Sequence, residues 1–235
     1  MFENLPLIIS RLAAGIPQTV IATVGGIVLT IVLASVAGLA LLSRSRLVRT
    51  VSRTYVEVFR GTSEVVQLFW IFFVLPALVG YQIIPLAAGV LVLGLNHGAY
   101  GAEIVRGAVQ SVPKAQYEGS LALSLSPRDR MLRVILPQAL VEMLPPFNNL
   151  FIQLLKSTAL LSLVVVNEVV RQGQLLVPNL GVGETLTIYL VELLIFLVLA
   201  LMITAVMRAL ERRASARLGR TPAPRARRAA VGGVA

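Results

Sequence analysis

The stretch VVQLFWIFFVLPALVGYQIIPLAAGVLVLGLNHGAYGA, residues 65–102, decides the fold class because it holds 38 residues without one charged side chain. As a single α-helix it would be about 57 Å long, almost twice the ~30 Å hydrocarbon thickness of a bilayer. Pro76, Gly80 and Pro85 interrupt it. The stretch therefore predicts a hairpin of two membrane-spanning helices.

The rest of the chain has the same character, with 57% hydrophobic and 14% charged residues over a length of 235. Hydrophobic runs of this length predict an all-α integral membrane protein. We expect five spans at roughly 16–42, 55–80, 85–106, 146–166 and 185–207. They lie in one transmembrane domain, 16–213, which follows an external or interfacial segment, 1–15, and precedes a basic tail, 214–235.

The basic residues set the orientation. The chain carries 21 Lys and Arg and a net charge of +10, and most of these residues flank the predicted spans on one side of the membrane. The positive-inside rule then places the N-terminus outside and the C-terminus in the cytoplasm. The Pro-, Arg- and Ala-rich tail is predicted to be disordered and to act as a topology anchor, rather than as a lipid-specific site. This placement of charge argues against a nucleic-acid partner.

Several functions are made improbable by what the chain lacks. It has no cysteine and a single histidine, His97, so a catalytic metal or a thiol nucleophile is not expected. The acidic N-terminus does not resemble a cleaved signal peptide. No GxxxxGK[ST] phosphate loop is present, so ATP hydrolysis would need another chain.

The polar loop between spans 3 and 4 predicts two short helices. Tyr117, Leu121 and Leu125 recur at helical spacing after Pro113. Ser126-Pro127-Arg128-Asp129 has the form of a capping box that opens a second helix. Such a loop could dock into a cytoplasmic partner or rest on lipid, and periodicity alone leaves both readings open.

Span 3 carries two distinct faces. Gly94, Gly98 and Gly101 form a small-residue surface suited to close helix contact. Asn96 and Tyr100 lie nearly opposite, with Glu103 at the cytoplasmic end. This polar face either lines a substrate pathway or forms interhelical hydrogen bonds, and for Glu103 we expect a structural role.

Span 4 repeats the pattern, because Asn149, Gln153 and Lys156 share one helical face. Pro145-Pro146 predicts a break in the helix before them. An unpaired ammonium at this depth is costly, so Lys156 is expected to pair with Glu192 of span 5. The pair would either contact a zwitterionic substrate or serve as a buried structural pair.

A resemblance identifies the loop. Residues 116–137 carry Glu118-Gly119-Ser120, Ser124, Val134 and Leu136-Pro137 at the spacing of the EAA loop of ABC-transporter permeases. Gly119 and Ser120 stand where the pattern has two alanines, Ser124 stands for its glycine, and Val134 for its isoleucine.

Other segments resemble the polar amino acid uptake family of these permeases, over roughly residues 15–213. They are YVEVFRGTSEVVQLFW (55–70), GAYGAEIVRGAVQSVPKAQYE (98–118) and LPPFNNLFIQLLKSTALLSL (144–163). Two departures stand out. Ser63-Glu64 replaces the usual Pro-Leu, and Lys156-Ser157-Thr158-Ala159 replaces Lys-Asp-Thr-Ser.

The resemblance implies a permease subunit of an ABC importer in the bacterial cytoplasmic membrane, for polar or charged amino acids or an ectoine-type compatible solute. Glu118, Gly119, Ser120, Ser124, Leu136 and Pro137 would couple the chain to an ATPase. Arg60 and Glu64 would lie at the inner gate. Alternatively, Arg60 and Glu64 would form an ion pair at the membrane interface, at the cytoplasmic start of span 2.

The implied partners are a second permease, identical or homologous, two copies of a cytoplasmic ATPase that binds ATP and magnesium, and an external solute-binding protein. No cofactor or metal is expected on this chain. An ATP-independent secondary transporter or channel is the alternative, although the inverted repeats or charged rings that it predicts are not apparent. A membrane enzyme is the least favoured class, because it would need paired carboxylates or a histidine cluster.

Overall fold

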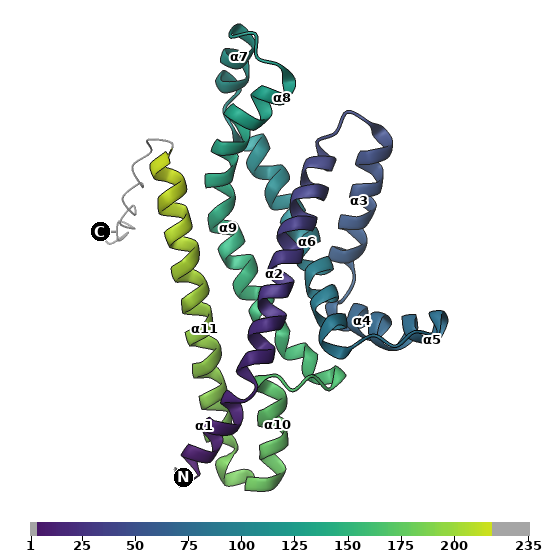
Figure 1. Cartoon of the computed structure of the whole chain (residues 1–235), viewed down its shortest axis with the longest axis vertical. Coiled ribbons are helices and arrows are strands. Elements are labelled where there is room, and N and C mark those ends of the chain that lie inside the picture. The colour runs from purple at the N-terminus through teal and green to yellow at the C-terminus, as the bar shows by residue number, and fades with distance from the viewer. Residues whose placement is uncertain (1–3, 218–235) are drawn as a thin grey trace, which may run out of the picture.

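The computed structural model describes residues 4–217, and every element in that range is a helix (Figure 1). In chain order the elements are α1 (Leu5–Ala13), α2 (Ile16–Leu41), α3 (Arg46–Gly61), α4 (Glu64–Phe69), η1 (Trp70–Val74), α5 (Leu75–Val79), α6 (Pro85–Ser111), α7 (Lys114–Ala122), α8 (Pro127–Asp129), η2 (Arg130–Ile135), α9 (Leu136–Ser157), η3 (Thr158–Val164), α10 (Val169–Leu180) and α11 (Val182–Arg217). Both η1 and η2 are π-helical, and η3 is a 3₁₀-helix. The predicted all-α class is confirmed.

Within the described chain, three helical stretches are long and apolar enough to cross a membrane: Leu5–Leu41, Pro127–Val164 and Gly183–Ala216. A fourth is added if α3 and the helical arm that follows it, Glu64–Val79, count as one broken span. Helix α6 has 27 residues, enough for a crossing. It starts at Pro85, as predicted, but runs on to Ser111. The count of five spans stays a prediction.

The second predicted span, 55–80, is not one straight helix. Helix α3 ends at Gly61, and the arm from Glu64 to Val79 leaves it at an angle of 105°. Figure 1 shows α4 and α5 extending sideways from the bundle. Because Thr62 and Ser63 adopt extended backbone, the chain turns between the two helices.

Helices α2 and α6 pack at backbone contact distance along the predicted small-residue face. A Cβ atom on Gly101 would lie 2.6 Å from Ala34 Cβ, and one on Gly98 would lie 2.8 Å from Leu33 Cβ. A Cβ atom on Gly94 would likewise collide with Leu29. The predicted close-contact surface of this helix is therefore confirmed.

The predicted break at Pro145-Pro146 is wrong, since α9 continues through both prolines to Ser157. Unwinding here would expose further backbone N–H and C=O groups in a region where water is scarce, so the helix persists despite two missing donors.

The two ends of the bundle differ. Figure 1 shows α7 and α8 at one end and α1 with α10 at the opposite end. Ile8 and Leu12 of α1 are buried in a small core with Leu176 and Ile188. Helix α11 ends at Arg217, so the first four residues of the predicted tail are helical, and the remainder lies outside the described residues.

Candidate functional site

The polar stripe of α9 consists of Asn149, Gln153 and Lys156, and all three residues are exposed. Helix α9 lies within an apolar stretch that is long enough to span a membrane. An exposed amide or ammonium is costly against hydrocarbon, so this face requires water or another polypeptide beside it. The stripe is the first element of the candidate site.

Lys156 and Glu192 line one pocket of about 270 Å³ between α9, α10 and α11. Tyr189 and Phe196 are further members of its wall. Among the described residues, no ion pair within 4.0 Å joins Lys156 to any carboxylate. The two predicted partners thus share a cavity with space between them, and their role as a pair stays a prediction.

Glu192 is buried, and its Oε1 atom has no hydrogen-bond partner among the described residues. This oxygen lies against the backbone of Gly173 in α10, at a place that the Cβ atom of any larger residue would occupy. Gly173 therefore provides the room in which the Glu192 carboxylate sits.

A second buried carboxylate, Glu168, lies outside the membrane-spanning segments at the start of α10. Its two oxygens accept hydrogen bonds from the backbone N–H groups of Val170 (2.8 Å) and Arg171 (2.7 Å). Burial raises the pKa of Glu168 to about 7, although these two N–H donors act in the opposite direction. Sequence reasoning missed this residue because glutamate is not among the favoured N-cap residues.

The side chain of Asn96, on α6, contacts the bend between α3 and α4. Its Nδ2 atom donates to the carbonyl of Phe59 (2.9 Å) and to Gln67 Oε1 (3.2 Å). Gln67 donates in turn to Phe59 O and to Thr62 Oγ1. These bonds satisfy backbone carbonyl groups that have no helical partner where α3 ends. Asn96 thus takes part in interhelical hydrogen bonding, one of the two roles expected for this face. A substrate-pathway role for Asn96 stays a prediction.

The two residues assigned to the inner gate point to different partners. The guanidinium of Arg60 lies over the ring of Tyr100, 5.0 Å from its centroid. Glu64 instead accepts a hydrogen bond from Ser157 (2.9 Å). The alternative Arg60–Glu64 ion pair is not formed among the described residues, because the chain bends between them. Glu103 pairs with Arg106 of its own helix at 2.6 Å.

His97 is buried beside Glu64, with 3.5 Å between His97 Nδ1 and Glu64 Oε1. The same ring nitrogen lies 3.0 Å from the carbonyl of Leu93. Glu64, Ser157 and His97 therefore form a polar cluster where α4, α6 and the end of α9 meet.

The loop between α6 and α9 contains the short helix α7, as predicted, but the second predicted helix is not separate, because α8 continues through η2 into α9. Ser126 Oγ accepts from the backbone N–H of Asp129 at 3.1 Å, which confirms the predicted cap. The Asp129 carboxylate bonds to the Ser126 hydroxyl, and not to its backbone N–H. Glu118 and Gly119 are exposed on α7, whereas Ser120 is buried.

Ser124 ends α7 with a positive φ of 54°. Its N–H donates to Leu121 O (2.8 Å), and the next N–H, of Leu125, donates to Ser120 O (3.1 Å). This is a Schellman C-cap, in which glycine is strongly favoured at the residue that takes positive φ. The glycine of the EAA pattern falls at this position. The left-handed backbone is the physical reason for a glycine there.

A helical bundle with an exposed polar stripe inside the membrane and a capped helical loop at one end defines a membrane transport subunit. The family of binding-protein-dependent transport system inner membrane components matches residues 26–216. The chain belongs to this family, which makes it the multi-pass inner-membrane permease subunit of an ABC importer.

Named relatives agree with this assignment. The chain is 44% identical over 179 residues to the probable amino-acid ABC transporter permease protein y4tF of Sinorhizobium fredii, covering 74% of each chain. It is 35% identical to the L-cystine permease TcyB of Bacillus subtilis, covering 86% of each. It is 38% identical to the glutamine permease GlnP of Escherichia coli, covering 91% of this chain and 95% of the other.

Solved structures share the fold. A crystal structure of an amino acid ABC transporter with histidines superimposes with a TM-score of 0.81 at 28% identity, covering 91% of this chain and 98% of the other. The MetNI methionine ABC transporter in an inward-facing conformation gives 0.74 at 19% identity, covering 91% and 99%. The relatives are transport permeases and not enzymes, and ABC importers hydrolyse ATP in a separate ATPase subunit.

Proposed function

We propose that this permease imports polar amino acids and that the substrate passes along the polar stripe of α9. The carrying observation is the exposure of Asn149, Gln153 and Lys156 on a helix of membrane-spanning length. Relatives named for glutamine, L-cystine and arginine transport support a polar amino acid as the substrate class. An ectoine-type solute is the competitor to include in an uptake assay.

The proposed complex contains two permease subunits, because one bundle leaves its polar stripe open. Two ATPase chains, which carry ATP and magnesium, would dock on α7 and α8 through Glu118, Gly119 and the Leu136-Pro137 end of the loop. The external binding protein would deliver substrate at the opposite end, beside α1 and α10. The basic flanking residues support an external N-terminus and a cytoplasmic C-terminus.

The test uses proteoliposomes that hold the assembled permease, ATPase and binding protein. Gln153→Leu and Lys156→Met should reduce uptake of the substrate that the binding protein holds, while the complex still assembles. Leu194→Met, an exposed apolar position on α11, is the matched control and should leave uptake unchanged. Normal uptake by both stripe variants would overturn the proposed pathway.

A further inference from the structure

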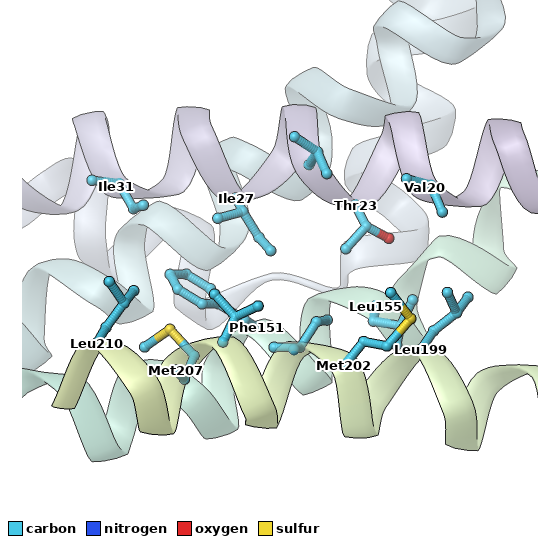
Figure 2. A pocket seen from close by; sticks show the side chains of 13 residues that line it. Val20, Thr23, Ile27, Ile31, Phe151, Leu155, Leu199, Met202, Met207 and Leu210 are labelled. Carbon is cyan, nitrogen blue, oxygen red and sulfur yellow. The ribbon is translucent and has the colours of Figure 1, made fainter. Parts of the chain in front are cut away.

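A groove of about 340 Å³ lies between α2 and α11, with α9 as its floor (Figure 2). Helix α2 contributes residues between 20 and 31, and α11 contributes residues between 199 and 210. The one polar lining residue, Thr23, donates its hydroxyl hydrogen to Thr19 O at 2.7 Å. The groove therefore offers a ligand an almost wholly apolar surface.

The groove faces away from the proposed substrate pathway. At 3.6 residues per turn, Phe151 and Leu155, which form its floor, lie roughly on the opposite side of α9 from Asn149, Gln153 and Lys156. A second permease or an aqueous path is needed on the polar side. The groove lies on the other side of α9, so lipid could reach it without entering that path.

Helix α11 is consistent with contact to hydrocarbon, because only 11% of its most apolar 18-residue window is buried. Leu197, Val198 and Leu201 are among its exposed side chains. The groove between two such helices is a hollow within the acyl-chain region of the membrane, where water does not enter a site without polar partners.

The length and the charged end of the groove select one occupant. From Leu199 to Leu210 it follows α11 for about 16 Å, close to half of the ~30 Å hydrocarbon core, which is the depth of one leaflet. Arg213 follows Leu210 at i+3 on the groove face of α11, whereas Arg208 and Arg212 are exposed on the opposite face of this helix. Basic clusters beside membrane helices on the cytoplasmic side attract anionic lipid headgroups.

We propose that this groove binds one anionic phospholipid of the cytoplasmic leaflet. One acyl chain fills the space between Ile27, Met202 and Val206, and the phosphate lies against Arg213. The proposal rests on the proposed cytoplasmic C-terminus and on the substrate pathway lying along the polar side of α9, but not on which amino acid the importer carries.

Native mass spectrometry of the assembled transporter tests the site. Complexes released from nanodiscs of equal phosphatidylglycerol and phosphatidylcholine should retain phosphatidylglycerol after most other lipid is stripped. Val206→Trp fills the groove and should abolish that retention. Leu201→Trp places the same bulk on the outward face of α11, and it should retain the lipid as the native complex does.

The headgroup contact has its own variant. Arg213→Gln should remove the preference for phosphatidylglycerol over phosphatidylcholine, whereas Arg46→Gln, an exposed arginine at the start of α3, should preserve it. Equal retention of both lipids by the native complex, or equal retention by Val206→Trp and Leu201→Trp, would overturn the proposal.

A measurement on the native groove covers the case in which Val206→Trp does not fold. Phosphatidylglycerol with a photoreactive acyl chain should label peptides that contain residues 20–31 and 199–210. Even labelling around α11 would refute a specific site. The chain has no cysteine, so Met202→Cys introduces a unique thiol. Cross-linking of Met202→Cys to a second permease would show that protein, not lipid, fills the groove.

Discussion

The Ser157 hydroxyl donates a hydrogen bond of 2.9 Å to Glu64 Oε2, joining the last residue of α9 to the first residue of α4. Both positions depart from the motifs that this chain resembles in the polar amino acid uptake family, which have leucine where Glu64 stands and aspartate where Ser157 stands. Relative to those motifs, the carboxylate lies on the other side of this contact, so we expect the two departures to compensate each other.

This exchange predicts strong coupling between the two positions. Ser157→Asp places a second carboxylate against Glu64 and should lower uptake and complex stability, because like charges at this distance oppose each other. Adding Glu64→Leu to Ser157→Asp should restore most of the loss. A double-mutant cycle on uptake and on thermal unfolding measures the coupling. Additive effects of the two substitutions would contradict the contact.

Gly173 and Glu192 form a second coupled pair. Gly173→Ala puts a methyl group where Glu192 Oε1 lies, so the carboxylate or α10 must move. We expect uptake to fall by about tenfold, equivalent to roughly 1.4 kcal/mol. Glu192→Ala removes the clash and should make Gly173→Ala harmless to assembly. If Gly173→Ala is as damaging in the Glu192→Ala background as in the presence of Glu192, the steric explanation fails.

Ser124 carries backbone strain that glycine would relieve. Ser124→Gly should stabilise the loop by about 0.5–1 kcal/mol, since glycine adopts positive φ without steric cost and this gain exceeds its added unfolded-chain entropy. Hydrogen exchange of α7 amides in the assembled transporter reports the change. Ser126→Gly is the contrasting control, because it removes a cap at φ −60° and should increase exchange in α8. Faster exchange in α7 of Ser124→Gly would contradict this account.

The buried carboxyl of Glu168 predicts that the stability of the fold depends on pH. Burial raises its pKa to about 7, above the usual range near 4.3. Folding therefore favours the protonated carboxyl. The stabilisation that Glu168 contributes in this form is fully present below about pH 4 and is lost as the pH rises through about 7. Glu168→Gln should flatten the fall in unfolding temperature between pH 5 and 8. Glu118→Gln, on the exposed loop, should leave the slope unchanged, and an identical slope in both variants would refute the assignment.

Part of this architecture could be predicted because it is local. Pro85 starts α6, Ser126 caps a helix in the loop, and the glycines of residues 94–101 form a surface for close helix contact, each from nearby residues alone. The bend after Gly61 could not be predicted, because it depends on Asn96 and Gln67 meeting the carbonyl of Phe59 across three helices.

The candidate site shows the same division. Helical periodicity placed Asn149, Gln153 and Lys156 on one face, and the structure leaves that face exposed. Periodicity could not indicate that Glu192 sits against Gly173 at a distance from the ammonium, because the separation between α9, α10 and α11 is a property of their packing.

The sequence by itself determined that this chain is a membrane permease whose loop between spans 3 and 4 has the spacing of the EAA loop. Long apolar runs, the placement of arginine and the EAA spacing are properties of consecutive residues, and the bilayer imposes helices on such runs. Only the tertiary structure decided which polar groups meet. It joined Ser157 to Glu64, placed Glu192 on Gly173 and opened an apolar groove between α2 and α11, because these contacts depend on how close whole helices can approach and at what angle.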